Sequence, residues 1–171
     1  MASREPHLLH SKMQELVRSW LVRVPFDVLI YCTAREAHEQ AVLYSHGRTE
    51  AQIASGVLRL DALKLAGPSG LLARQNPTPG PRVTNALPGL SFHQSHWLES
   101  EYAALALDFV PLSYGKPLWS DMALYEEAGA KAEEVGLTWS GRWKTFRETA
   151  HLQYDRQGEI KIIALAQGAY R

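Results

Sequence analysis

The chain has 171 residues, a length that fits one domain and can bury a sizeable apolar core. Its 18 basic and 18 acidic side chains cancel, so no bulk charge attracts nucleic acid or an anionic membrane surface. The single cysteine, Cys32, excludes an intrachain disulfide and any zinc site built from several cysteines. We therefore expect one monomeric domain over 1–171, in which a metal site would use His and carboxylate ligands.

The first twenty residues mix apolar side chains with His, Lys, Gln and Glu. They lack the continuous apolar run of a signal peptide. No later segment reaches the roughly 18 apolar residues that a membrane span requires. We expect a protein that is made without an export signal and does not insert into a membrane.

Apolar side chains recur at helical spacing over residues 7–21, which predicts an amphipathic first helix. The apolar run 27–31 predicts a buried strand, and a second helix is predicted over 34–45. Thr49 is expected to cap a short third helix that ends at Ala54.

A long irregular loop is predicted over about 56–90, because five Pro and four Gly fall between residues 67 and 89. The apolar run 104–110 predicts a strand. Ser120 is expected to cap a helix that ends near Val135, before Gly136.

Near the C-terminus, 150–154 and 159–165 are predicted to form two strands around a hairpin turn at 155–158. The pattern as a whole predicts an α+β fold, in which helices pack on a small, mainly antiparallel sheet.

Seven histidines are available as metal ligands, and four of them have unpromising surroundings. His7 and His10 are expected on the solvated side of the first helix. His38 and His46 fall on the second helix without a matching carboxylate. The remaining histidines are His93, His96 and His151.

Four polar residues stand out from their surroundings. His93 follows the Pro/Gly-rich loop, and Asp108 lies inside an apolar strand, where a carboxylate needs a positive partner such as a metal ion or Arg35. Glu148 precedes His151 by three residues. A regular strand would place these two side chains on opposite faces, so they act together only if the backbone bends between them.

Three segments match, in order, the motif blocks of a known family: Ser91-Phe-His93, Ala104-Leu-Ala-Leu-Asp108 and Glu148-Thr-Ala-His151. Flanking stretches match it as well: Thr33-Ala-Arg35, Arg82-Val-Thr-Asn-Ala86 and Gly136-Leu-Thr-Trp-Ser-Gly-Arg-Trp143. The chain thus resembles the VanY-like family of zinc D-alanyl-D-alanine carboxypeptidases and L-alanyl-D-glutamate endopeptidases, especially its phage endolysins.

The resemblance implies a hedgehog/DD-peptidase-like zinc fold. It implies one Zn²⁺ on three ligands: His93, Asp108 and His151. Glu148 would be the general base and Arg35 would stabilise the oxyanion or bind a substrate carboxylate. Ser91 would also contact substrate, unless it only hydrogen-bonds within its turn.

The spacing of the first block departs from the family. His93 and Asp108 are fifteen residues apart, which is longer than the family's spacing, so 94–103 is predicted to be an insertion. This insertion contains His96, which is an alternative ligand to His93. The segment 50–80 is also longer than in the family.

The activity implied by the resemblance is hydrolysis of stem peptides in bacterial peptidoglycan, with L-alanyl-D-glutamate endopeptidase as the main prediction. A phage endolysin of this kind would accumulate in the host cytoplasm and act on the cell wall after release. The alternatives are a D-Ala-D-Ala carboxypeptidase and a non-catalytic zinc domain that binds the wall. A binding domain would not need the base Glu148.

Overall fold

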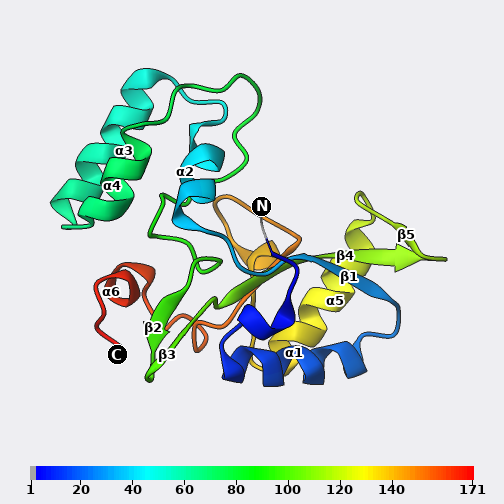
Figure 1. The fold of residues 1–171 in the computed structure, drawn as a ribbon. Helices are drawn as coiled ribbons and strands as arrows, with labels where there is room; N and C mark the ends of the chain where they lie inside the picture. The colour runs from blue at the N-terminus through cyan, green and yellow to red at the C-terminus, as the bar shows by residue number, and fades with distance from the viewer. Residues whose placement is uncertain (1–2) are drawn as a thin grey trace.

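The computed structural model describes residues 3–171, and its centre is an antiparallel sheet (Figure 1). The strand order is β1–β4–β7–β6, and the bounds are β1 (Val28–Cys32), β4 (Ala106–Ser113), β7 (His151–Gln153) and β6 (Thr138–Trp139). A short strand, β5 (Lys116–Pro117), pairs with the end of β4. The first six residues of β4 are all buried, so this strand is covered on both faces.

Two helices, α1 (Ser11–Arg23) and α5 (Met122–Glu134), pack side by side against the sheet (Figure 1). Trp20 of α1 is fully buried, and its indole N–H donates to the carbonyl of Ala128 at 2.9 Å. Phe109 of β4 meets Trp20 edge to face, with ring centroids 5.1 Å apart. These contacts form the main apolar core.

A second apolar cluster joins α2 (Ala37–Ser45), α3 (Glu50–Ala62) and α4 (Ala66–Leu72), which lie together at the upper left of Figure 1. Thr49 caps α3 as predicted, but the helix continues eight residues beyond Ala54. The prediction of an irregular loop over 56–90 is therefore wrong in its first half.

The predicted insertion 94–103 forms a hairpin, β2 (His96–Leu98) and β3 (Glu101–Ala103), beside helix α6 (Ile162–Ala166) (Figure 1). The second predicted C-terminal strand, 159–165, is wrong, because this apolar segment forms α6 and buries Leu165 against the hairpin.

Four further corrections concern the starts and caps of helices. The first helix starts at Ser11, after a short 3-10 turn η1 (Pro6–Leu8), and the second at Ala37. His10, which was expected on the solvated side of this helix, is instead its N-cap and is buried. Its Nε2 lies 3.2 Å from the Leu98 carbonyl. Asp121, not Ser120, caps α5.

The predicted α+β class with a small antiparallel sheet is confirmed. Among the helices of residues 3–171, none combines the length and the apolarity that crossing a bilayer requires. The division of the chain into a single domain stays a prediction.

Candidate metal centre and catalytic site

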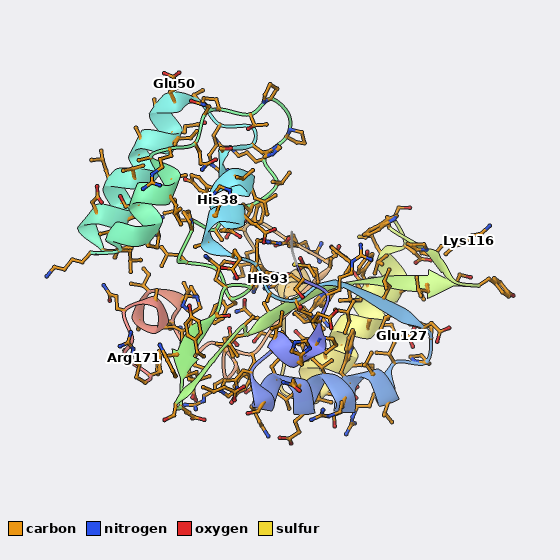
Figure 2. The ribbon with its side chains drawn as sticks, in the orientation of Figure 1. His38, Glu50, His93, Lys116, Glu127 and Arg171 are labelled. Carbon is orange, nitrogen blue, oxygen red and sulfur yellow. The ribbon has the colours of Figure 1, made fainter. Side chains whose placement is uncertain are left out.

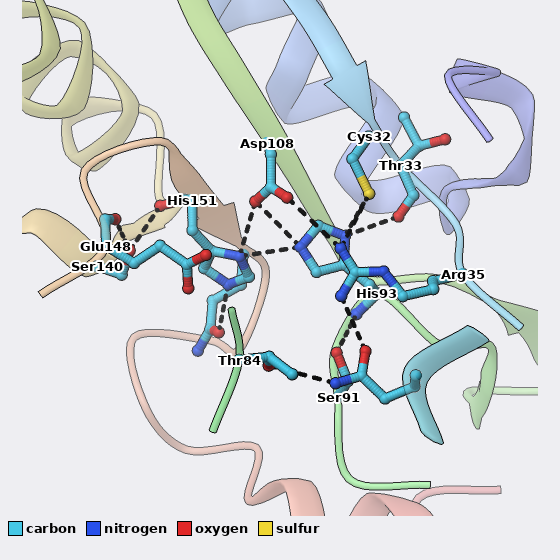
Figure 3. Close-up of polar contacts among 12 residues, drawn as sticks. Cys32, Thr33, Arg35, Thr84, Ser91, His93, Asp108, Ser140, Glu148 and His151 are labelled. Atoms are coloured by element: carbon cyan, nitrogen blue, oxygen red, sulfur yellow. Dashed lines mark hydrogen bonds and ion pairs between the residues drawn. The ribbon is translucent and has the colours of Figure 1, made fainter. Parts of the chain in front are cut away.

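Three side-chain atoms converge at the centre of the protein (Figure 3). His93 Nε2 lies 3.1 Å from Asp108 Oδ1 and 3.0 Å from His151 Nδ1. The third side of this triangle, from His151 Nδ1 to Asp108 Oδ1, is 3.2 Å. All three residues are buried, and Figure 2 shows His93 where the α2–α4 cluster meets the sheet.

Strand register explains why two of these side chains meet. Asp108 in β4 pairs directly with His151 in β7, and with Cys32 in β1 on its other side. Directly opposed residues of neighbouring antiparallel strands project from the same face of the sheet. The sheet therefore holds the carboxylate and the imidazole in contact.

His93 reaches the same point from a turn, because the chain around it is hydrogen-bonded to the segment after β1 and to the segment just before β4. Its carbonyl accepts from the Arg35 N–H at 2.8 Å, and the carbonyl of Phe92 accepts from the Leu105 N–H at 2.8 Å. Its own N–H donates to Ser91 Oγ at 3.3 Å. These bonds fix the direction of the imidazole.

The two imidazole rings direct their lone pairs toward the centre of the triangle, because the outer nitrogen of each ring faces a hydrogen-bond acceptor. His93 Nδ1 lies 2.9 Å from the Thr33 carbonyl, and His151 Nε2 lies 3.1 Å from Gln153 Oε1. Both partners are acceptors, so both of these nitrogens carry the proton. The inner nitrogens and the Asp108 oxygen are then three acceptors in contact, an arrangement that requires a cation between them.

The triangle fits a zinc ion in both donor type and size. Zinc–nitrogen bonds of about 2.0–2.1 Å in tetrahedral geometry separate neighbouring ligand atoms by about 3.3 Å. The three observed separations are 3.0, 3.1 and 3.2 Å. Two neutral imidazoles and one carboxylate also match the ligand sets of catalytic zinc sites, which use three protein ligands.

A second grouping, Cys32 with His93 and Asp108, also brings potential ligand atoms within 4.8 Å of one another. Cys32 Sγ lies 3.6 Å from His93 Nδ1, the nitrogen that faces the Thr33 carbonyl and not the centre of the triangle. The sulfur also accepts from Arg35 Nη2 at 3.4 Å. Cys32 therefore supports the outer side of His93, and His151 completes the inner ligand set.

The pKa values of the triad show how strongly it favours a cation. Burial alone would lower the pKa of His93, but the adjacent Asp108 carboxylate raises it to about 10. Burial would raise the pKa of Asp108, but the charges and hydrogen bonds of the two histidines hold it well below its usual range. A divalent metal ion binding here would displace a proton from the triad.

Glu148 approaches the triad because the chain bends before β7 (Figure 3). The N–H of His151 donates to the Glu148 carbonyl at 3.3 Å, which closes a turn over 148–151. The Ser140 hydroxyl, in the 3-10 turn η2 (Ser140–Arg142), donates to the same carbonyl and to the His151 carbonyl. Since the strand begins only at His151, the two side chains are not forced onto opposite faces.

Burial raises the pKa of the Glu148 carboxyl above its ordinary value, and this effect outweighs the opposing charge of His151. A raised pKa brings a carboxylate closer to the proton affinity that a general base requires near neutral pH.

Arg35 lies at the edge of the triad. Its Nη1 donates to Gln40 Oε1 at 2.8 Å, and its Nη2 lies 3.8 Å from Asp108 Oδ2. Gln40 is fully buried and donates in turn to the Ala86 carbonyl at 2.7 Å. The Nε of Arg35 is buried and has no hydrogen-bond partner within residues 3–171. Arg35 is thus an ion-pair partner of Asp108 that keeps one unused donor.

The two remaining candidates, Ser91 and His96, lie close to the triad but contact none of its three inner atoms in the described chain. Ser91 Oγ accepts from the His93 N–H, and no contact of its hydroxyl with Glu148 or Arg35 exists in the described chain. His96 Nε2 donates to the Ser91 carbonyl at 3.0 Å, and burial lowers the pKa of its imidazole. The structure therefore places His93, and not His96, beside Asp108 and His151.

A cavity of about 630 Å³ opens onto the triad. His93, Asp108, His151, Glu148 and Arg35 all line it. Its other walls include Tyr31, the segment 83–86, the segment 90–92, and Trp143 with Phe146. Of the two tryptophans in the segment 136–143, Trp139 is buried in the core and Trp143 lines the cavity.

Several residues that support the site were missed from the sequence. Cys32 lies in no recognisable motif. The hydrogen bond between Gln40 and Arg35 and the contact of His93 with the Thr33 backbone carbonyl are not visible in the sequence. Asp155 could have been found, because it follows His151 and Gln153 at the alternating spacing of one strand face.

Comparison with known proteins agrees with this geometry. Residues 90–154, which contain the triad and Glu148, match the model of a family described as D-alanyl-D-alanine carboxypeptidase. No curated protein sequence matches the chain. The chain is similar to the crystal structure of the Serratia marcescens L-Ala D-Glu endopeptidase ChiX, with 14% identity and a TM-score of 0.53, over 94% of this chain and 92% of that chain. The predicted family resemblance and fold are confirmed.

Proposed function

We propose that this protein is a zinc-dependent peptidase that hydrolyses the stem peptides of bacterial peptidoglycan, most specifically the bond between L-Ala and D-Glu. The observation that carries this proposal is the buried triangle of His93, Asp108 and His151 acceptor atoms, open to a cavity that Glu148 also lines. The family match and the likeness to ChiX support the substrate class.

In this mechanism, His93, Asp108 and His151 hold Zn²⁺, which supplies Lewis-acid activation of water and of the scissile carbonyl. Glu148 accepts the proton of the attacking water and delivers it to the leaving amine, so that peptide and water give a carboxylate and an amine. Arg35 lines the same cavity, and its guanidinium is proposed to donate to a substrate carbonyl or carboxylate, which orients the scissile bond. Ser91 is proposed to contribute to the same wall of the cavity.

We propose further that the enzyme acts as a phage endolysin, alone and as a monomer, on the cell wall. The proposal rests on the motif blocks that resemble endolysins. Purified protein applied to bacteria with a permeabilised outer barrier should clear the culture. A protein that digests isolated stem peptides but leaves such cells intact would have the peptidase activity without this role.

Mass spectrometry of digested peptidoglycan tests the reaction. Purified sacculi treated with the zinc-loaded protein should yield fragments with a new N-terminal D-Glu. Release of terminal D-Ala would instead identify a D-Ala-D-Ala carboxypeptidase, the activity that the matching family is named for. Zinc binding without any product would indicate a non-catalytic wall-binding domain. The Glu148→Gln protein, purified in parallel, controls for a contaminating hydrolase.

A further inference from the structure

We propose that Asp155 is a positioning residue for the metal ligand His151, and that it acts through the side-chain amide of Gln153. This inference rests on the zinc site of the proposed function. It assigns a role in metal binding to a carboxylate that does not itself touch the triad.

The three side chains form a continuous buried chain of hydrogen bonds that leads away from the metal site. His151 Nε2 lies 3.1 Å from Gln153 Oε1, and Gln153 Nε2 donates to Asp155 Oδ2 at 2.6 Å. All three residues are buried, with 5–6% of each exposed. His151 and Gln153 share one face of β7, and Asp155 lies two residues beyond the end of that strand.

The side chain of Asp155 accepts three hydrogen bonds. Its Oδ1 accepts from the Thr138 hydroxyl at 2.5 Å and from the Gly158 N–H at 3.0 Å. Its Oδ2 accepts from Gln153. Three donors therefore surround this one carboxylate.

The carboxylate decides which way the Gln153 amide points. Since Oδ2 of Asp155 accepts, the NH₂ group of Gln153 must face it, and the amide oxygen must face His151. That oxygen needs a donor, so the proton of the imidazole lies on Nε2. The lone pair of His151 is thereby kept on Nδ1, the nitrogen that faces His93 and Asp108.

Exchanging the two polar groups gives a test that separates this role from simple packing. In Asp155→Asn, the amide oxygen stays with the two donors on the Oδ1 side, and the new NH₂ faces Gln153. The glutamine then turns its oxygen to Asn and its NH₂ to His151, which moves the imidazole proton to Nδ1, inside the metal site. In Gln153→Glu, two carboxylates face each other instead.

The double variant Gln153→Glu/Asp155→Asn restores the order of donors and acceptors and keeps the net charge. The introduced carboxylate accepts from both the new amide and His151 Nε2. We expect each single variant to weaken zinc binding about 10- to 100-fold, and the double variant to recover most of that loss. Zinc dissociation constants are measured by competition with a chromophoric chelator.

Two further measurements test the role of Asp155 without relying on enzyme activity, and separate it from an effect on folding. Imidazole ¹⁵N chemical shifts in the zinc-free protein should report an Nε2-protonated His151 in the parent and the double variant, but not in Asp155→Asn. Thr138→Val removes only a donor to Oδ1. It should lower thermal stability while leaving zinc affinity close to that of the parent.

The inference is overturned if Asp155→Asn binds zinc as tightly as the parent. It is also overturned if the double variant binds zinc no more tightly than the single variant with the lower zinc affinity. Either result leaves the proposed function intact. A parent protein that binds no zinc would instead contradict the proposed function, while the ¹⁵N shifts would still test the orientation of His151.

Discussion

The environment of Glu148 has a direct consequence for the pH dependence of catalysis. A general base works only when ionised, so activity is lost as pH falls through its pKa. Burial raises the pKa of Glu148 above that of an ordinary glutamate. We therefore expect the acidic limb of the kcat/KM profile to lie at a higher pH than for an ordinary glutamate.

The Glu148→Gln variant tests whether that limb belongs to this residue. It should lose about 10²- to 10⁴-fold in kcat while it retains zinc and its melting temperature. Zinc content is measured across the same pH range, because protonation of His93 also displaces the metal ion. A variant with near wild-type turnover would show that another group is the base.

At the residue scale, the sequence predicted which side chains converge better than it predicted the contacts that orient them. A carboxylate within an apolar strand and an E-x-x-H motif depend on side-chain type and spacing, both of which are visible in the sequence. The contacts that orient them are of another kind. The Thr33 carbonyl is backbone, and Gln40 reaches Arg35 from a helix whose position depends on tertiary packing.

At the scale of elements, the turn that carries Glu148 is braced by a tryptophan held between two glycines. Trp139 donates its indole N–H to the Thr149 carbonyl at 2.8 Å. A Cβ added at Gly129 in α5 would lie 2.1 Å from its ring, and one at Gly141 equally close. The absence of side chains at these positions lets α5 and η2 approach the indole.

Gly129→Ala should therefore destabilise the protein by about 1–3 kcal/mol, because the rigid ring and the helix backbone must move apart. Gly70→Ala is the matched control, since it also lies in a helix but a Cβ there meets nothing within 4 Å. It should be neutral or slightly stabilising. Urea unfolding measures both, and equal effects would contradict this account of Gly129.

The elements that sequence analysis missed were those in which tertiary contacts outweigh local preference. The sequence of α4, AGPSGLL, contains two glycines and a proline, yet Leu72 is fully buried against α3 and Ser69 donates to Asp61 at 2.5 Å. Pro68 falls in the first turn, where a missing N–H is tolerated. In α6, β-branched Ile162 and Ile163 suggested a strand, but both pack on the α2–α4 cluster.

At the scale of the whole molecule, the candidate metal site joins three parts of the chain that are distant in sequence: the turn at His93, β4 at Asp108 and β7 at His151. A metal ion that binds only the folded state adds its binding free energy to stability. At free zinc 1,000 times the dissociation constant, this amounts to about 4 kcal/mol.

We expect zinc to raise the melting temperature by roughly 10 °C, and a chelator to reverse the change. His93→Ala should abolish the shift, whereas His96→Ala should retain it, because His96 contacts the Ser91 carbonyl outside the triad. Calorimetry with and without zinc provides the measurement. The opposite pattern for the two histidines would place the ligand in the insertion.

The fold class was predictable because it depends on broad alternation of apolar segments, and the resemblance covered most of the chain. The structure of the extra segments was not predictable, because the sequence of residues 94–103 does not by itself require a hairpin.

The β2–β3 hairpin affects how the two metal-ligand candidates His93 and Asp108 are brought together. In a flexible chain, each doubling of the loop between two ligands costs about 0.6 kcal/mol in closure entropy.

Here His96 pairs with Ala103, so the chain leaves the vicinity of His93 and returns to it before reaching Asp108. The inserted residues form a closed side branch, and the backbone path between the two ligands is shorter than their separation in sequence. Strand pairing alone brings the ends together. An insertion of this kind can grow at its tip, the turn at Glu99 and Ser100, without lengthening the loop that metal binding must close.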